Sequence, residues 1–173
     1  MKRRSVISLL VLAVAIIYCT QYIFIAFVPN LLFAIAKYRS GKPLNTVIRA
    51  PKTDAKFRRV ILPNPDFIYD ACFYDATKND ILITGELADS TQYASLAFYG
   101  NNLQPYYVRS NQIGLKQHFK IRLSSVNRVR SDIISPTKQG AILLRVLVTD
   151  SAKMQQALAI QKSLQIEELE QDE

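Results

Sequence analysis

The chain has 173 residues, a formal net charge of +8 and 49% hydrophobic residues. Once an apolar N-terminal segment is set aside, about 135 residues remain, which is the usual size of one domain. Its two cysteines, Cys19 and Cys72, are too few for the disulfide framework of a small secreted domain.

Residues 1–4 form a basic N-terminus, and residues 5–28 follow without a charged side chain. As a helix, residues 5–28 would span about 36 Å, enough to cross a hydrocarbon core of about 30 Å. We therefore predict a transmembrane helix over residues 5–28. A cleavable signal peptide is the alternative, because Ala34-Ile35-Ala36 imitates a cleavage site, but signal-peptide cores have only about 7 to 15 apolar residues.

The segment 29–57 is predicted to lie at the membrane surface. Pro29 should break the helix or bend it sharply, and the amphipathic run LLFAIAKYR suits the headgroup region. Lys37, Arg39 and Lys42 are expected to contact anionic lipid headgroups. We expect no nucleic-acid partner, because only Tyr38 and Phe57 could stack on bases in this basic segment.

The orientation in the membrane depends on two basic flanks that nearly balance. Lys2, Arg3 and Arg4 favour a cytoplasmic N-terminus, whereas Lys37, Arg39 and Lys42 favour the reverse. We expect the N-terminus to be cytoplasmic and the domain to be exported, because an uncleaved signal-like start normally enters the membrane that way.

Residues 58–149 read as a β-rich domain, because short apolar runs alternate with turn-forming residues. The expected strands are Arg58 to Leu62, Phe67 to Tyr74, Asp80 to Leu87, Gln92 to Tyr99, Pro105 to Ser110, Phe119 to Ser125 and Ala141 to Val148. The last run is apolar on both faces apart from Arg145, which is typical of a central strand.

Residues 150–173 are predicted to form a C-terminal helix, from Ser151 to about Leu169, and an acidic tail. The expected fold class is mainly β with flanking helices: an N-terminal transmembrane helix, an antiparallel β-sheet or sandwich, and this C-terminal helix.

No set of residues in the sequence specifies a reaction, so the catalytic residues are unknown. We expect no metal site and no cofactor, because His118 is the single histidine and the chain has no P-loop, dinucleotide fingerprint or G-x-S-x-G motif. Asp66 and Asp70 would stand about 13 Å apart in a strand, too far for a glycosidase pair.

Tyrosines are enriched in the β region, where they can line a groove or simply pack at the edge of the core. The candidate binding residues are Asn64, Asp66, Tyr69 and Tyr93.

The run from Leu62 to Asn111 resembles an uncharacterised bacterial family, domain of unknown function 1254. The similarity rests on Asn64-Pro65-Asp66, Ile68-Tyr69, Tyr74-Asp75 and the strand from Tyr93 to Tyr99. Asp70 departs from the pattern, because the family usually has serine there. The resemblance implies an N-terminal anchor, an envelope location and a companion domain that longer relatives carry on the same chain, but no known catalytic residue.

These observations predict a single-pass protein of the bacterial inner membrane with a periplasmic domain. Its partners would be the lipid bilayer and a companion membrane-anchored protein, and its domain would be a non-enzymatic binding module. The alternative is an envelope enzyme or carrier that acts on a saccharide or other small molecule through a cleft lined by Tyr and Asp.

Overall fold

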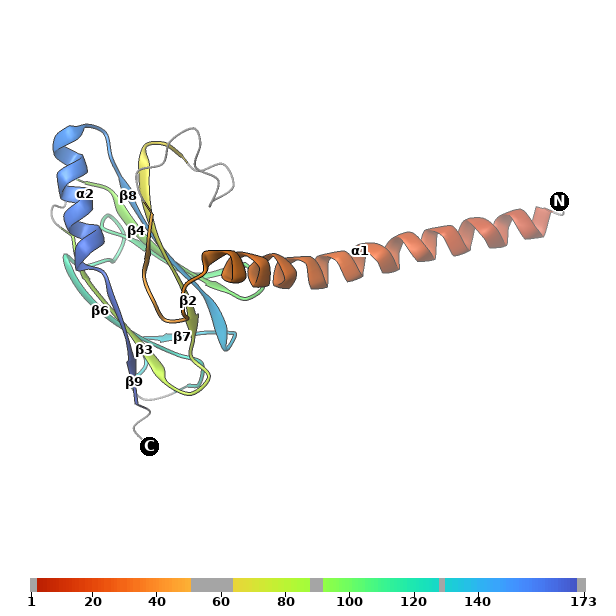
Figure 1. Ribbon diagram of the computed structural model, residues 1–173. Coiled ribbons are helices and arrows are strands. Elements are labelled where there is room, and N and C mark those ends of the chain that lie inside the picture. The colour runs from red at the N-terminus through yellow and green to blue at the C-terminus, as the bar shows by residue number, and fades with distance from the viewer. Residues whose placement is uncertain (1–2, 51–63, 88–91, 128–129, 171–173) are drawn as a thin grey trace.

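The computed structural model describes residues 3–50, 64–87, 92–127 and 130–170, which form a long helix and a β-sandwich with a second helix (Figure 1). The helices are α1 (Arg3–Ser40) and α2 (Ser151–Ser163). The strands are β1 (Ile48–Arg49), β2 (Phe67–Asp75), β3 (Asp80–Glu86), β4 (Ala94–Gly100), β5 (Pro105–Ser110), β6 (His118–Ser124), β7 (Ile133–Ile134), β8 (Gln139–Leu147) and β9 (Gln165–Leu169). The predicted fold class is confirmed, and the strand predicted at Arg58 to Leu62 lies outside the described residues.

Two sheets make up the sandwich. The five-stranded sheet has the order β1-β2-β8-β4-β5 and is antiparallel throughout. The four-stranded sheet has the order β7-β6-β3-β9 and is antiparallel except between β6 and β7. As its apolar residues predicted, β8 is a central strand, with β2 on one side and β4 on the other.

The hydrophobic core lies between the sheets, because alternate residues of each strand point inward. The five-stranded sheet contributes Ile68, Cys72, Leu96, Phe98, Ile142 and Leu144, and the four-stranded sheet contributes Ile81, Ile83, Ile121 and Leu123. α2 adds Ala157 and Ile160. Its N-terminus is capped by Asp150, whose side chain accepts a hydrogen bond from the Lys153 amide at 2.8 Å.

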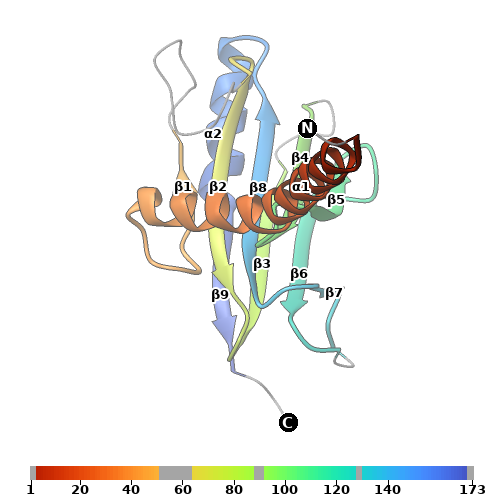
Figure 2. The same cartoon turned by 90° about the vertical axis from the view of Figure 1, so that its right-hand side faces the viewer.

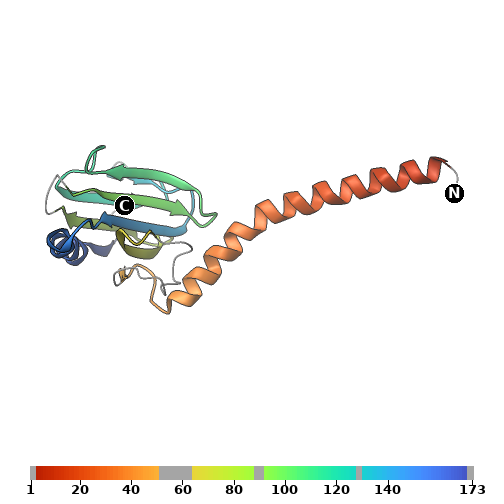
Figure 3. The same ribbon diagram turned by 90° about the horizontal axis from the view of Figure 1, so that it is seen from above.

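α1 is longer than predicted and is not broken at Pro29. It continues through this residue to Ser40, and Figure 3 shows that it curves on its way to the domain. The Asn30 side chain donates to the Ala26 carbonyl at 3.1 Å, so a carbonyl in the turn around the proline has a partner. The predicted separation of residues 31–39 from the helix is therefore wrong.

The C-terminal segment is also different from the prediction, because the helix ends at Ser163 and residues 165–169 form β9. Leu164 is buried with an extended backbone, which turns the chain onto the edge of β3. Glu168 accepts hydrogen bonds from Asn45 at 2.6 Å and Asn79 at 3.0 Å. In this strand Ile166 packs against the core of the sandwich, a contact that two further solvent-exposed helical turns would not provide.

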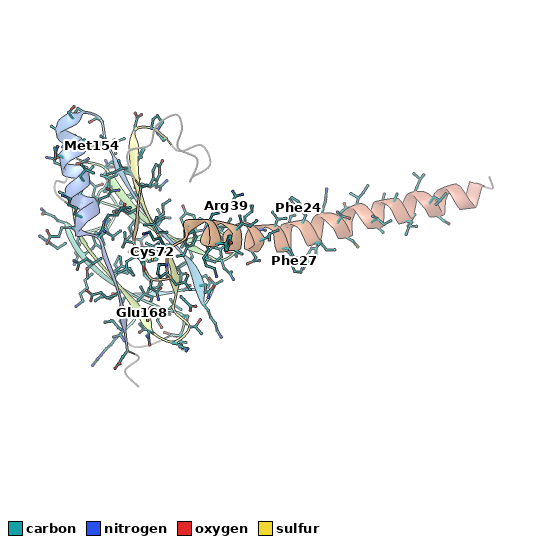
Figure 4. The ribbon with its side chains drawn as sticks, in the orientation of Figure 1. Phe24, Phe27, Arg39, Cys72, Met154 and Glu168 are labelled. Atoms are coloured by element: carbon teal, nitrogen blue, oxygen red, sulfur yellow. The ribbon has the colours of Figure 1, made fainter. Side chains whose placement is uncertain are left out.

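The end of α1 contacts the outer face of the five-stranded sheet, as Figure 2 shows where the helix passes in front of β2 and β8. Phe33 is 3% exposed and meets the edge of the Phe73 ring, with the ring centroids 5.6 Å apart. Lys37 donates to the Gln139 side chain at 3.1 Å. The remainder of α1 stands free of the domain in Figure 4, where Phe24 and Phe27 project into open space.

Candidate functional site

Three of the predicted binding residues form one turn at the start of β2. The Asn64 side chain accepts a hydrogen bond from the Asp66 amide at 2.9 Å, and the Asn64 carbonyl accepts one from Phe67 at 3.1 Å. The Tyr69 hydroxyl accepts a hydrogen bond from the Asn64 amide at 3.1 Å. An Asx turn of this kind explains why Asn and Asp stand before the strand.

Tyr93 joins this turn through Phe67. The Phe67 ring lies 6.3 Å from Tyr69 and 6.1 Å from Tyr93, measured between centroids. The structure therefore brings the four predicted residues to one end of the five-stranded sheet. Tyr69 is only 8% exposed and its hydroxyl already serves the turn, so the contacts give this cluster a structural role, and a binding role stays a prediction.

A cavity of about 430 Å³ lies elsewhere, on the four-stranded sheet beside the end of α2. It is lined by Thr84, Gly85, Glu86, His118, Phe119, Ser163 and Gln165. The Phe119 ring lies directly on Gly85, in space that any larger residue at that position would need. The glycine thus allows the ring to cover the backbone of β3 at the cavity.

The cavity contains the histidine for which the sequence suggested no partner. His118 Nδ1 lies 3.2 Å from Glu86 Oε1, because the two residues are cross-strand neighbours in β6 and β3. A carboxylate beside an imidazole is an arrangement that orients the ring for proton transfer. Both side chains are exposed, so water competes for their interaction.

Ser163 is not available as a nucleophile in this cavity. Its hydroxyl accepts a hydrogen bond from the Glu86 amide at 2.9 Å and lies 2.8 Å from the Ile160 carbonyl and 3.0 Å from the Glu86 carbonyl. These bonds attach the end of α2 to β3. None of the residues that line the cavity is an activated nucleophile of the kind that covalent catalysis needs.

Two carboxylates of the domain are buried, Asp70 of β2 and Asp80 of β3. Gln161 of α2 donates to Asp70 at 2.6 Å, and burial raises the pKa of Asp70 to about 7, against the opposing effects of Gln161 and Arg49. Asp80 is paired with Arg122 at 2.8 Å. Among the described residues, no three His, Cys, Asp or Glu side chains are grouped closely enough to hold a metal ion.

The predicted membrane-surface residues lie where α1 meets the domain. Arg39 and Lys42 are exposed, and Figure 4 shows Arg39 at this junction. Lys37 instead points to the domain, bonded to Gln139, with its nitrogen 5.9 Å from the centre of the Phe33 ring. Among the described residues, α1 is the one helix long and apolar enough to cross a membrane, a test that a signal sequence also passes.

Comparison with known proteins adds a family and a fold. The model of a family described as protein of unknown function (DUF1254) matches residues 44–168. No curated protein matches. The chain is similar to the crystal structure of the VPA0106 protein from Vibrio parahaemolyticus, with 11% identity and a TM-score of 0.62 over 82% of this chain and 34% of that one.

A second solved structure is similar, a putative uncharacterized protein from Burkholderia cenocepacia. It shares 14% identity and a TM-score of 0.51, over 90% of this chain and 43% of that one. The chain therefore spans less than half the length of these two solved proteins. At such identities the likeness is one of fold.

Proposed function

The chain belongs to the DUF1254 family of proteins of unknown function, and we propose that it is a membrane-anchored envelope protein whose β-sandwich binds a partner protein on the periplasmic side. The observation that carries this proposal is the free part of α1. None of its most apolar 18-residue window is buried against the domain. Side chains such as Phe24 and Phe27, 63% and 68% exposed, would be costly to leave in water.

The contact between α1 and the sheet supports retention of the helix over its removal as a signal peptide. The small-residue pattern at residues 34–36 lies after Phe33, so cleavage there would remove the side chain that packs on Phe73. A signal sequence destined for removal gains nothing from such a contact. The helix also continues past that pattern to Ser40 without interruption.

Membrane anchoring is tested by fractionation of cells that express the full chain with a C-terminal tag. We expect the intact chain to stay with membranes through high-salt and alkaline washes and to be released by detergent. Recovery of the chain, first forty residues included, in a detergent-free soluble fraction would contradict the anchor.

The periplasmic side is tested by reporters fused after Glu173. Alkaline phosphatase should be active there and green fluorescent protein should be dark, because the first folds in an oxidising compartment. The reverse pattern would place the domain in the cytoplasm and would contradict the proposed compartment while leaving the anchor intact.

The binding role is tested by purification in mild detergent followed by cross-linking and identification of the cross-linked chains. The proposal expects one specific membrane or envelope partner that is lost when the domain is unfolded by a core substitution such as Leu144→Asp. A chain that stays monomeric and captures nothing specific would count heavily against a binding module.

One observation favours the second candidate, an envelope enzyme or carrier for a saccharide or other small molecule. It is the cavity on the four-stranded sheet, which differs from the expected Tyr and Asp cleft. A panel of mono- and disaccharides, screened by thermal shift in detergent, tests it. A ligand that raises the Tm of the wild type but not of a Glu86→Gln, His118→Gln double variant would support this candidate.

A further inference from the structure

The two outer faces of the sandwich differ in their chemistry. On the four-stranded sheet, cross-strand neighbours such as Thr84, Lys120 and Gln165 lie in one row, and Arg122 and Glu167 flank Leu82 in the next. Such alternation of inward apolar and outward polar side chains is typical of a sheet face in water.

The outer face of the five-stranded sheet instead has two adjacent apolar rows, and is called the apolar face below. One row across four strands consists of Ala71, Leu143, Ala97 and Val108. The next row is Phe73, Ala141 and Tyr99. The row on the other side of Leu143 is polar apart from Tyr69, and consists of Arg145, Ser95 and Ser110. The Arg145 guanidinium donates to Ser95 at 3.2 Å. A face of this composition is normally covered.

α1 shows which way this face is turned. The helix docks on this sheet through Phe33 and then runs away from it, whereas α2 lies on the opposite side of the domain (Figures 1 and 2). A bilayer that contains the free part of α1 therefore lies on the side of the apolar face, with the polar outer face of the four-stranded sheet turned from it.

The length of helix between the predicted membrane span and Phe33 agrees with close contact between the sheet and the bilayer. Phe33 follows the last residue of the predicted span by five positions, which is about 7.5 Å at 1.5 Å per residue. The headgroup layer on each side of the hydrocarbon core is about 5 to 8 Å thick. The sheet thus begins where the headgroups are, and Arg39 and Lys42 lie exposed at the same junction.

From these observations we propose that the outer face of the five-stranded sheet rests on the lipid headgroups of the membrane that holds α1. This inference rests on the proposed anchoring and goes beyond it, because an anchored domain could equally stand clear of the lipid. The apolar rows displace water at the surface, and the basic residues of the junction attract anionic lipids, at about 1 kcal/mol per residue near the surface.

The test uses the full chain reconstituted in vesicles of phosphatidylethanolamine and phosphatidylglycerol, with a nitroxide at one of three positions. Val108→Cys places the label on the apolar face, where Val108 is 45% exposed. Lys120→Cys places it on an exposed position of the polar face. Both variants carry Cys19→Ala. The third sample is the wild type labelled at Cys19, while Cys72 stays unlabelled because its thiol is buried, with a pKa raised to about 12.

Relaxation by a nickel-chelating lipid should be at least about tenfold stronger for the Val108 label than for the Lys120 label. The sheets are packed about 10 Å apart, so the labels stand on opposite sides and paramagnetic relaxation falls with the sixth power of distance. A soluble nickel complex should reach the Lys120 label more readily. The Cys19 label should be shielded from the soluble complex by lipid.

Each of the other outcomes contradicts either the contact of the sheet with the headgroups or the anchoring of α1. Equal access of soluble nickel to both faces would show that the domain stands clear of the bilayer. A Val108 label shielded from both reagents would show that a protein, such as a second copy or a companion domain, covers the face. A Cys19 label open to soluble nickel would refute the anchor itself, which separates failure of the proposed function from failure of this inference.

Discussion

Asp70 shows how a single buried carboxyl can shape the stability of the whole domain. It points into the sandwich from β2, is 1% exposed, and is held by Gln161 of α2 at 2.6 Å. Its charge is only partly compensated, since burial outweighs the stabilising effects of Gln161 and Arg49 and raises the pKa from 3.8 to about 7.

The raised pKa of Asp70 predicts a definite pH dependence. Below pH 3.8 the Asp70 carboxyl is protonated in both the folded and the unfolded state, so its burial does not lower the stability of the domain. Between pH 3.8 and about 7 the folded state binds one more proton than the unfolded state, so stability falls as the pH rises. Above pH 7 the full cost, of order 4 kcal/mol, opposes folding. We expect Asp70→Asn to raise the Tm at pH 8 and to leave it nearly unchanged at pH 4.

Thermal unfolding of the full chain in detergent measures this difference. The matched control is Asp66→Asn, an exposed aspartate four residues earlier, which should not alter the slope of Tm against pH. An Asp70→Asn variant that is less stable at pH 8 would show that Arg49 and Gln161 stabilise the carboxylate more than burial penalises it.

Arg122 provides the second test at this scale, because it alone among the described residues is paired with the fully buried Asp80, at 2.8 Å. Removing one partner of a buried ion pair leaves an uncompensated charge and costs about 3 to 5 kcal/mol. We expect Arg122→Ala to lower the free energy of unfolding by that amount in chemical denaturation.

Two controls separate the ion pair from a general effect of truncation. Lys120→Ala, an exposed neighbour on the same strand, should change stability by less than about 0.5 kcal/mol. Adding Asp80→Leu to Arg122→Met should restore much of the loss, since an apolar pair of similar volume removes the buried charge. A double variant as unstable as Arg122→Ala would argue against the ion pair as the cause.

At the scale of elements, the contact of α1 with the sheet is the feature on which the position of the domain depends. The described residues attach the helix through two neighbouring side chains, Phe33 on Phe73 and Lys37 on Gln139. Neither Phe33 nor Lys37 belongs to the core of the sandwich. The contact between α1 and the sheet can therefore be lost without unfolding of the domain.

We expect Phe33→Ala to detach the end of α1 from the sheet while the Tm of the domain changes little. Loss of the ring contact exposes the last turns of α1, so trypsin should cleave after Lys37 and Arg39 severalfold faster in detergent. Phe27→Ala, which alters an exposed ring six residues earlier, serves as the control and should leave the rate unchanged. Equal cleavage rates for the wild type and Phe33→Ala would show that the Phe33 contact does not attach α1 to the sheet.

At the scale of the whole molecule, the proposed orientation in the membrane rests on a small difference between two basic flanks. The N-terminal flank has Lys2, Arg3 and Arg4, and the domain side has Lys37, Arg39 and Lys42. The structure affects this balance, because Lys37 is bonded to Gln139 and turned to the domain. That contact forms only after folding, however, and the positive-inside preference acts during insertion.

Replacing Lys2, Arg3 and Arg4 by asparagine should therefore invert a substantial fraction of the chains. Reporters fused after Glu173 would then change from active phosphatase and dark fluorescent protein to the opposite. Replacing Lys37, Arg39 and Lys42 instead should keep or strengthen the original orientation. A reporter pattern that neither triple replacement alters would show that the basic flanks do not decide the orientation.

Most strands could be predicted from the chain because their signals are local. The sequence predicts β5 with its observed bounds, and β2, β3, β4, β6 and β8 to within one or two residues, because turn-forming residues delimit apolar runs. The two-residue strands β1 and β7 and the acidic strand β9 carry no such pattern. They pair because a sheet edge is open beside them, and that depends on the rest of the fold.

The candidate site likewise has features that the local sequence predicts and features that depend on the fold. Proximity of Asn64, Asp66 and Tyr69 was predictable since they are close in sequence, whereas the cavity joins β3, β6, α2 and β9. Pairing of Glu86 with His118 follows from the register of two strands more than thirty residues apart. No periodicity in the sequence specifies that register.

By itself, the sequence determined an apolar helix long enough to cross a membrane, one β-rich domain and its family, because hydrophobicity, turn chemistry and motifs are properties of short segments. The tertiary structure decided that α1 passes through Pro29, that residues 165–169 are a strand, and that Asp70 is buried beside Gln161. It also decided which face of the sandwich carries the two apolar rows and contacts α1. These features depend on contacts between distant segments, whose energies no local pattern contains.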